Sequence, residues 1–153
     1  MSVKIRQAKV EDTNKLFNLT KRVWNDRLAG NLFAIAEYIK FGYVFVAVDN
    51  KNNIAGAITA LRTRDDKAYV SDIVIDKKYR KQGLASKLYK RLISYVGRRE
   101  IVAFVDHDDT PSYYLHKKLG FYPEKKMKAP YGLGSMKEMY LMKRKPEQKD
   151  PKT

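Results

Sequence analysis

The sequence predicts an α/β protein with a mixed sheet, and three observations point to that class. The chain has 153 residues with a hydrophobic fraction of 44%, which suits one domain with a sizeable core. Segments typical of strands alternate along it with segments of helical periodicity. Their order is strand, two helices, three strands, helix, strand, helix and two strands, which requires at least one parallel crossover.

The first half of the chain contains an expected hairpin. The polar turn 49–53 separates two apolar segments, so these should pair as antiparallel strands. Asp12 is expected to cap a helix whose apolar residues recur at helical spacing. The elements expected here are an opening strand at Val3 and Ile5, a helix after Asp12, a helix over 32–39, and strands over 43–48, 54–61 and 68–75.

The second half begins with the strongest helical pattern in the sequence. The apolar residues that recur there at helical spacing are Leu84, Ala85, Leu88, Leu92, Ile93 and Val96. The apolar run 101–105 is typical of a strand buried on both faces. Thr110 and Pro111 predict the start of a helix, and Gly120 its end. The last two strands are expected near Phe121 and over 139–142.

Composition and charge exclude several functions. The chain has no cysteine, so disulfides, thiolate metal sites and a cysteine nucleophile are excluded. No hydrophobic signal segment is visible, and the longest apolar run, 43–48, is too short to cross a bilayer, so a soluble cytoplasmic protein is expected. The net charge of +15 predicts a solvated basic surface or a polyanionic partner. Residues 1–142 form the predicted domain, and the charged segment 143–153 is a predicted disordered tail.

The turn before the strongest helix has the features of an anion-binding cradle. Its sequence runs Arg80, Lys81, Gln82, Gly83, Leu84, Ala85. Glycine lets the backbone approach a phosphate closely, and the first N–H groups of the helix point outward with the positive end of the helix dipole behind them. The alternative is a plain strand-to-helix turn. The string is neither a nucleoside triphosphatase loop nor a dinucleotide-binding fingerprint, because both need further glycines.

The pattern Arg-x-x-Gly-x-Ala after an aliphatic strand end resembles the acetyl-CoA motif of the GNAT superfamily of N-acetyltransferases. A second stretch, Leu115 to Phe121, resembles the Leu-Tyr-x-x-x-Gly-Phe signature of the same family. The resemblance covers roughly residues 2 to 142. It implies a mostly antiparallel mixed sheet flanked by helices, in which a parallel strand pair splays apart at the cofactor site.

The resemblance also implies a co-substrate and a reaction. Acetyl-CoA would bind with its pantetheine arm between the strands that end at Ile75 and Val105, and a primary amine would attack the thioester directly. The residues implied to bind acetyl-CoA are Ile73, Val74, Ile75, Arg80, Lys81, Gln82, Gly83, Leu84, Ala85 and Ser86. The acceptor could be a protein, a peptide or a small molecule. By the same analogy, the loops 25–31 and 130–136 would flank the acceptor.

Two proton transfers need catalytic groups. Asp72 is the first candidate for the base that deprotonates the amine, and Asp106 is the second. The family's acid, a tyrosine, is replaced by His116, which can donate a proton near neutral pH. Tyr113 lies one helical turn away and is the alternative acid, whereas Tyr114 is expected to pack in the core.

Other functions remain open at this point. The acidic segment 106–109 could suggest a metal, but consecutive residues on one loop rarely form a closed ligand set, so no metal site is expected. Asp108 or Asp109 is expected to cap the following helix instead. The alternatives to an enzyme are a basic nucleic-acid-binding domain, for which no motif is visible, and a coenzyme A-binding regulator that has lost its acid. A homodimer is compatible with the sequence.

Overall fold

The computed structural model of the chain describes residues 2–24, 31–134 and 136–146. Its contacts divide the chain into two compact units, one formed by residues 1–62 and 70–95 and the other by residues 63–69 and 96–153. Each unit is described by itself. None of the helices in the described ranges is long and apolar enough to cross a membrane.

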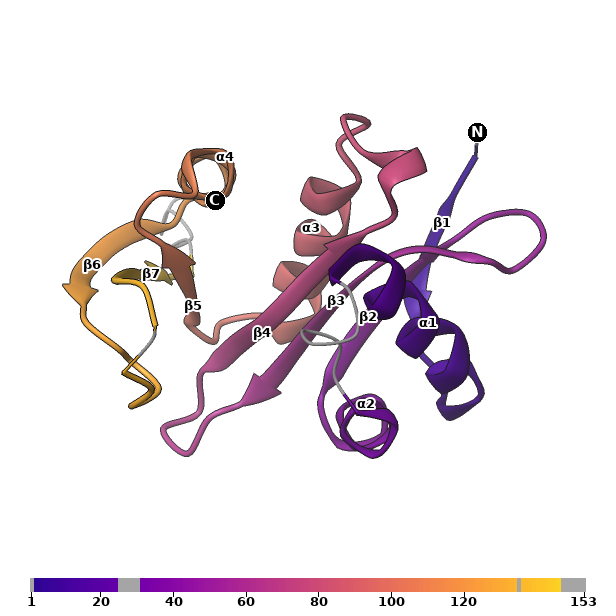
Figure 1. Ribbon diagram of the computed structural model, residues 1–153, viewed down its shortest axis with the longest axis horizontal. Helices are drawn as coiled ribbons and strands as arrows, with labels where there is room; N and C mark the ends of the chain where they lie inside the picture. Colours follow the sequence, from indigo (N-terminus) through magenta and orange to yellow (C-terminus); the bar gives the residue numbers. More distant parts are fainter. Residues whose placement is uncertain (1, 25–30, 135, 147–153) are drawn as a thin grey trace, which may run out of the picture. The chain divides into compact units, whose positions relative to one another are not determined.

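The first unit contains four strands and the three helices that pack on them (Figure 1). The strands lie in the order β1-β2-β3-β4, and β2 pairs antiparallel with both β1 and β3. The elements are β1 (Lys4–Gln7), the 3-10 helix η1 (Val10–Asp12), α1 (Thr13–Trp24), α2 (Leu32–Phe41), β2 (Tyr43–Val48), β3 (Ile54–Arg62), β4 (Ala68–Ile75), the 3-10 helix η2 (Lys77–Tyr79) and α3 (Leu84–Val96).

The strands of this unit are buried because helices cover both faces of the sheet. Val44, Val46 and Val48 alternate along β2 and join the apolar cluster that includes residues of α1 and α2. Phe45 points the other way, where the ring of Tyr95 from α3 lies 5.3 Å from its own, centroid to centroid. Helices α1 and α2 therefore pack on one face of the sheet and α3 on the other.

Gly56 of β3 lets α3 approach the sheet closely. A Cβ atom built at this position would lie 2.8 Å from Ile75 Cδ1, 3.0 Å from the Val74 carbonyl oxygen and 3.4 Å from Leu88 Cδ1. The first distance is shorter than real Cβ contacts show and the second is tighter than nearly all of them, so a side chain at residue 56 would push neighbouring groups aside. The seating of α3 against the end of β4 thus depends on a glycine in the neighbouring strand.

The second unit contains a three-stranded antiparallel arrangement in the order β5-β7-β6 and one helix. Its elements are β5 (Ile101–Asp106), α4 (Thr110–Lys118), β6 (Tyr122–Met127) and β7 (Met139–Arg144). The first residues of β4 also belong to this unit, and Ala68 N donates a hydrogen bond of 2.9 Å to Glu100 O, immediately before β5. Such a bond is expected where the two strands of the predicted parallel pair begin side by side.

All the helices and strands expected from the sequence are present, but the end of the last strand was predicted too early. Strand β7 continues to Arg144, two residues beyond the expected domain boundary at 142. Lys143 Nζ lies 3.4 Å from a Glu100 carboxylate oxygen and 3.5 Å from one of Glu124. Lys143, which the sequence predicts to lie in the charged tail, thus pairs with two carboxylates of the second unit. Residues 147–153 of the predicted tail lie outside the described residues.

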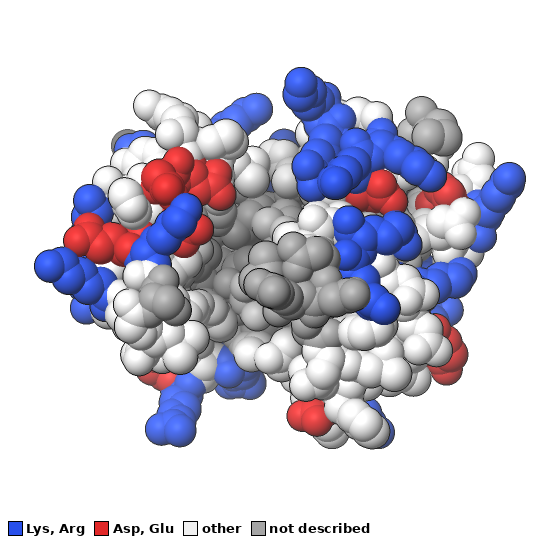
Figure 2. All heavy atoms as spheres, in the orientation of Figure 1, with Lys and Arg blue, Asp and Glu red and all other residues white. Residues whose placement is uncertain are grey.

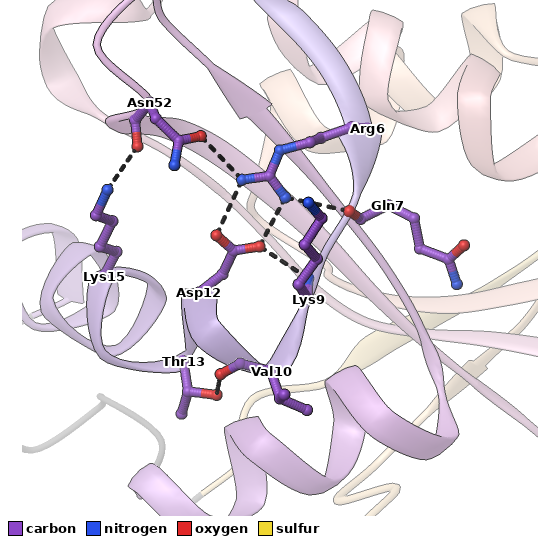
Figure 3. Close-up of polar contacts among 8 residues, drawn as sticks. All are labelled: Arg6, Gln7, Lys9, Val10, Asp12, Thr13, Lys15 and Asn52. Carbon is purple, nitrogen blue, oxygen red and sulfur yellow. Dashed lines mark hydrogen bonds and ion pairs between the residues drawn. The ribbon is translucent and has the colours of Figure 1, made fainter.

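An ion pair ties β1 to the entrance of α1 (Figure 3). Arg6 donates two hydrogen bonds to the carboxylate of Asp12, of 2.7 and 2.9 Å, and Lys9 N donates a third, of 2.8 Å. Arg6 also reaches Asn52 Oδ1 in the β2–β3 turn at 3.0 Å, and Lys15 donates to the carbonyl of Asn52. Asp12 was expected to cap a helix. Its carboxylate accepts the Lys9 N–H as one half of a capping box at η1, and it also connects β1 with η1, because Arg6 lies within reach of both oxygens.

We predict that Asp12→Asn lowers the free energy of unfolding by about 1–3 kcal/mol at pH 7, because it leaves Arg6 without its charged partner. The hydrogen bond from Arg6 holds the pKa of Asp12 below its usual value. The stabilisation is therefore complete above the unfolded pKa of about 3.9 and is lost as the pH falls through the lower, folded pKa. Urea unfolding of both proteins between pH 7 and pH 3 measures this difference.

Glu11→Gln is the matched control, because it removes the same charge from the exposed neighbouring residue. It should change the unfolding free energy by less than about 0.5 kcal/mol. Equal losses in the two variants would show that the ion pair with Arg6 contributes nothing specific.

Candidate active site

The turn between η2 and α3 has a backbone that leaves open space beside it. Lys81 has a φ of +64° and Gly83 a φ of +73°. A positive φ is uncommon for a residue other than glycine, and it costs Lys81 roughly 1–2 kcal/mol. A Cβ atom built on Gly83 would have no heavy atom within 4 Å. The backbone is therefore strained at Lys81, and the space beside Gly83 is open.

Helix α3 begins directly after this turn without a side-chain cap. The first intrahelical hydrogen bond shown at this end runs from Lys87 N to Gly83 O, at 3.1 Å. The N–H groups of Leu84, Ala85 and Ser86 have no carbonyl partner within the helix, and glycine offers them no side-chain acceptor. Together with the positive end of the helix dipole, these groups could interact with an anion, and the binding of a phosphate at this turn stays a prediction.

Cationic side chains gather around the same turn. Lys77, Lys78, Arg80 and Lys81 are all exposed. Figure 2 shows lysine and arginine side chains massed over η2 and the turn that follows it. The carboxylate of Asp76 precedes them; it accepts a hydrogen bond of 3.2 Å from Lys78 N. The turn therefore combines uncapped N–H groups with formal positive charge, as a polyanionic ligand requires.

The end of β4 leads into this turn. Val74 is buried in the cluster formed with α1 and α2, so Ile73 and Ile75 project toward the opposite face of the strand. Asp76 N donates to Ala55 O at 2.8 Å, which keeps the end of β4 on β3. Gln82 is exposed, and its side-chain amide lies 3.5 Å from Lys78 O. The binding of a pantetheine arm by the backbone at Ile73 and Ile75 stays a prediction.

A cavity of about 300 Å³ lies in the first unit under α1 and α2. Asp72 of β4 lines it, beside Thr59 of the neighbouring strand β3. Its full lining is Leu16, Thr20, Trp24, Asn31, Ala34, Ile35, Tyr38, Val44, Thr59, Ser71 and Asp72. The structure thus places the first predicted base in a partly open cavity with mainly apolar walls, on the strand that runs to the turn at Gly83.

The environment of Asp72 changes its acidity. Burial raises the pKa of the Asp72 carboxyl to about 6, and a hydrogen bond with the Thr59 side chain opposes that rise. Among the described lining residues Asp72 is the one with a charge. A carboxylate with a pKa near 6 is mostly ionised at neutral pH, yet it is a stronger base than an exposed aspartate. Asp72 can therefore accept a proton from a ligand in the cavity.

His116 lies in the second unit and is buried, with 3% of its surface exposed. Its Nδ1 atom is 2.7 Å from the carbonyl oxygen of Ser112, and its ring meets that of Phe121 edge-on at 5.0 Å. Burial lowers the pKa of His116, although the bond to Ser112 acts in the other direction. Because a carbonyl only accepts, the single proton of the neutral ring lies on Nδ1 and is directed at Ser112.

The tyrosines of α4 differ from their expected placement. Tyr113 is partly buried, and its ring centroid lies 5.6 Å from that of Tyr114 and 5.3 Å from that of Tyr140. The expectation that Tyr114 packs in the core was wrong, since 65% of its surface is exposed. His116 takes the buried position on α4 instead. The second predicted base, Asp106, is partly buried at the end of β5, opposite Met139 of β7.

The acidic segment after β5 has structural partners. Asp109 accepts a hydrogen bond of 3.1 Å from Ser112 N and so caps α4, as expected for this residue or its neighbour. Asp108 pairs with Lys137 at 3.0 Å. Among the residues that the structure describes, no group of three or more metal-ligating side chains comes together.

Apart from Asn31, which ends the predicted acceptor loop 25–31, sequence reasoning did not assign the other lining residues to a site. Thr59 is the one that acts directly on Asp72, and a signal for it exists, because it is a polar residue inside an apolar strand. Trp24 and Tyr38 were recognised only as helix residues. Most of the predicted acceptor loop 25–31 lies outside the described residues.

We predict that Thr59→Val raises the pKa of Asp72 further above 6, because it removes the hydrogen bond that favours the ionised carboxylate. Thr20→Val is the matched control. Thr20 lines the same cavity, but its hydroxyl donates to Phe17 O at 2.7 Å. A carbon-13 NMR titration of the aspartate carboxyls measures both variants. An equal pKa shift in the two, or none with Thr59→Val, would contradict this account.

Solved structures of acetyltransferases share the fold of the whole chain. The ribosomal-protein-S18-alanine N-acetyltransferase from Escherichia coli superposes with a TM-score of 0.81 at 16% identity, over 99% of both chains. Arabidopsis thaliana NAA60, in complex with a bisubstrate analogue, has a TM-score of 0.77 at 18% identity, over 95% of this chain and 98% of its own. An acetyltransferase of the GNAT family from Streptococcus pneumoniae has a TM-score of 0.78 at 21% identity, over 95% of this chain and 100% of its own. These likenesses confirm the predicted fold class.

Family membership comes from the sequence itself. No curated protein matches the chain. The model of the acetyltransferase (GNAT) family matches residues 10–121, a range that includes Asp72, the turn at Gly83 and helix α4. This range covers well over half of the chain, and the protein therefore belongs to the GNAT family of acetyltransferases.

Proposed function

We propose that the protein transfers the acetyl group of acetyl-CoA to a primary amine by direct attack of the amine on the thioester. The observation that carries this proposal is the position of Asp72. It lines a cavity with mainly apolar walls, and its strand, β4, leads to the start of α3 at Gly83. A proton acceptor and an anion-binding turn on one strand are what acetyl transfer from a nucleotide-bearing donor needs.

The proposed site for the diphosphate of acetyl-CoA is the turn at Gly83. The N–H groups from Lys81 to Ser86 would bind the phosphate oxygens, and Arg80 and Lys81 would supply charge. The backbone of Ile73, Val74 and Ile75 would hold the pantetheine arm, as the family resemblance implies. The open space beside Gly83 fits this use, since no protein atom lies where a side chain would be.

Asp72 is the proposed general base. An amine in water is mostly protonated at neutral pH, with a pKa of about 10.4 for a lysine-like amine, so its proton must leave before the nitrogen can attack. Asp72 accepts that proton, a nitrogen–carbon bond forms and the carbon–sulfur bond of the thioester breaks. Holding both reactants together contributes up to about 7–11 kcal/mol. Asp106 is the second candidate for the base.

Tyr113 is the proposed acid that protonates the leaving thiolate. A phenol hydroxyl is a proton donor at neutral pH. His116, the residue that replaces the family's tyrosine, holds its ring proton toward Ser112 O and has a lowered pKa. A neutral histidine in this tautomer is poorly suited to give up that proton, and this favours Tyr113.

We predict that Gly83→Glu reduces coenzyme A binding below detection, because it places a side chain and a negative charge in the phosphate cradle. Isothermal titration calorimetry with acetyl-CoA measures the affinity. Gly97→Glu is the matched control, since Gly97 also has a positive φ, of +63°, and open space around it, but follows the other end of α3. Unchanged affinity in a folded Gly83→Glu protein would remove the phosphate role from this turn.

We also predict that variants of the two proposed proton-transfer residues lose activity. Asp72→Asn and Tyr113→Phe should each lower kcat by about 10²–10⁴-fold at saturating acetyl-CoA. The wild-type rate should fall as the pH drops below about 6, where Asp72 becomes protonated, and Asp72→Asn should lack this fall. Rates from pH 5 to pH 9, with one confirmed acceptor, measure these effects.

His116→Asn tests the other assignment. The asparagine amide can still donate to Ser112 O, but it cannot act as an acid. This variant should retain most of its kcat, and a loss as large as that expected for Tyr113→Phe would make His116 the acid. Tight acetyl-CoA binding without transfer to any amine would instead indicate a coenzyme A-binding regulator.

A further inference from the structure

We infer that the acceptor is a small amine with one positive charge on an apolar stem of aromatic size, bound in the cavity beside Asp72. This inference rests on the proposed function and concerns the substrate class of the same site. It distinguishes such an arylalkylamine from a polyamine, from an amine that carries a carboxylate or phosphate, and from a peptide N-terminus.

The walls of the cavity are mainly apolar and aromatic. Six of its lining residues are hydrophobic and come from α1, α2 and β2: Leu16, Trp24, Ala34, Ile35, Tyr38 and Val44. Its volume of about 300 Å³ is at the lower end of the range for small-molecule sites. A stem that leaves water for these walls gains free energy in proportion to the apolar surface it buries.

Three of the polar lining side chains already have hydrogen-bond partners within the protein. The hydroxyl of Thr20 donates to Phe17 O at 2.7 Å, and Asn31 Oδ1 accepts from Ala34 N at 2.7 Å, as the cap of α2. The Thr59 side chain hydrogen-bonds to Asp72. A peptide N-terminus would bring backbone N–H and C=O groups that need partners of their own, and such a lining offers few.

Charge selects against most other amines. Asp72 is acidic, and no lysine or arginine is among the described lining residues. It attracts one ammonium group, which the rings of Trp24 and Tyr38 can also stabilise by cation–π contact. A second ammonium would find no second carboxylate among the described lining residues, and a carboxylate or phosphate near the amine would be repelled by Asp72.

The single tryptophan of the chain makes binding measurable without turnover. Trp24 lines the cavity, so its fluorescence reports directly on the occupant. Titration of the full-length protein with phenethylamine should change that fluorescence, with an affinity at least about tenfold tighter than for phenylalanine, spermidine, glucosamine 6-phosphate or the peptide Ala-Phe-amide. With acetyl-CoA present, kcat/KM for the five amines should follow the same order.

A matched pair of variants tests the charge argument. Ala34→Glu adds a carboxylate to the cavity wall and should shift the ratio of spermidine to phenethylamine affinity by tenfold or more toward spermidine. Ala36→Glu makes the same change on the same helix at a residue outside the lining, and it should leave the ratio unchanged.

The outcomes separate this inference from the proposed function. Tighter binding or faster acetylation of spermidine, the amino sugar phosphate, phenylalanine or the peptide overturns the inference and leaves acetyl transfer intact. The absence of any Trp24 response to phenethylamine also overturns it. Phenethylamine binding without acetylation of any amine supports the cavity chemistry and contradicts the proposed enzyme.

Discussion

The confinement of one carboxyl group between the helices and the sheet of the first unit governs the chemistry available to this protein. Asp72 stands on β4 and lines a cavity whose walls include residues of α1 and α2, and burial there raises the pKa of its carboxyl to about 6. Thr59 limits the rise by hydrogen-bonding to the ionised form. Without the apolar walls the carboxylate would be a weak base, and without Thr59 it would be protonated over more of the neutral range.

Strand β4 connects this carboxyl to the second feature of the unit. Four residues after Asp72 the strand has ended, and η2 and the turn at Gly83 carry the chain into α3. Close packing at Gly56 seats α3 beside the end of the strand, so the uncapped N–H groups are positioned by core contacts rather than by a mobile loop. The proposed proton acceptor and the proposed anion cradle thus lie on successive segments of the chain, which suits a reaction between two bound substrates.

The sequence predicted this segment well, because its signals are local. Apolar periodicity identified α3, and the glycine after a run of cations identified the turn. The partner of Asp72 could not be predicted in this way, since Thr59 is brought to it by the pairing of two strands. The same limit explains Asp12, whose local pattern predicts a cap but whose carboxylate meets Arg6 of β1. Lys143 likewise is predicted to lie in the tail, because its ion-pair partners Glu100 and Glu124 are distant in sequence and come beside it only in the folded sheet.

Lys81 shows what the turn costs the free protein. Its left-handed backbone would suit glycine or asparagine better, so the folded chain carries a local strain that another residue would relieve. Selection for heat resistance alone would therefore favour replacing Lys81, and the resulting protein would lose a cation from the mouth of the anion cradle. Under the proposed role of the turn, stability and ligand affinity make opposing demands at this residue, so a thermostable design should keep Lys81 and gain its stability elsewhere.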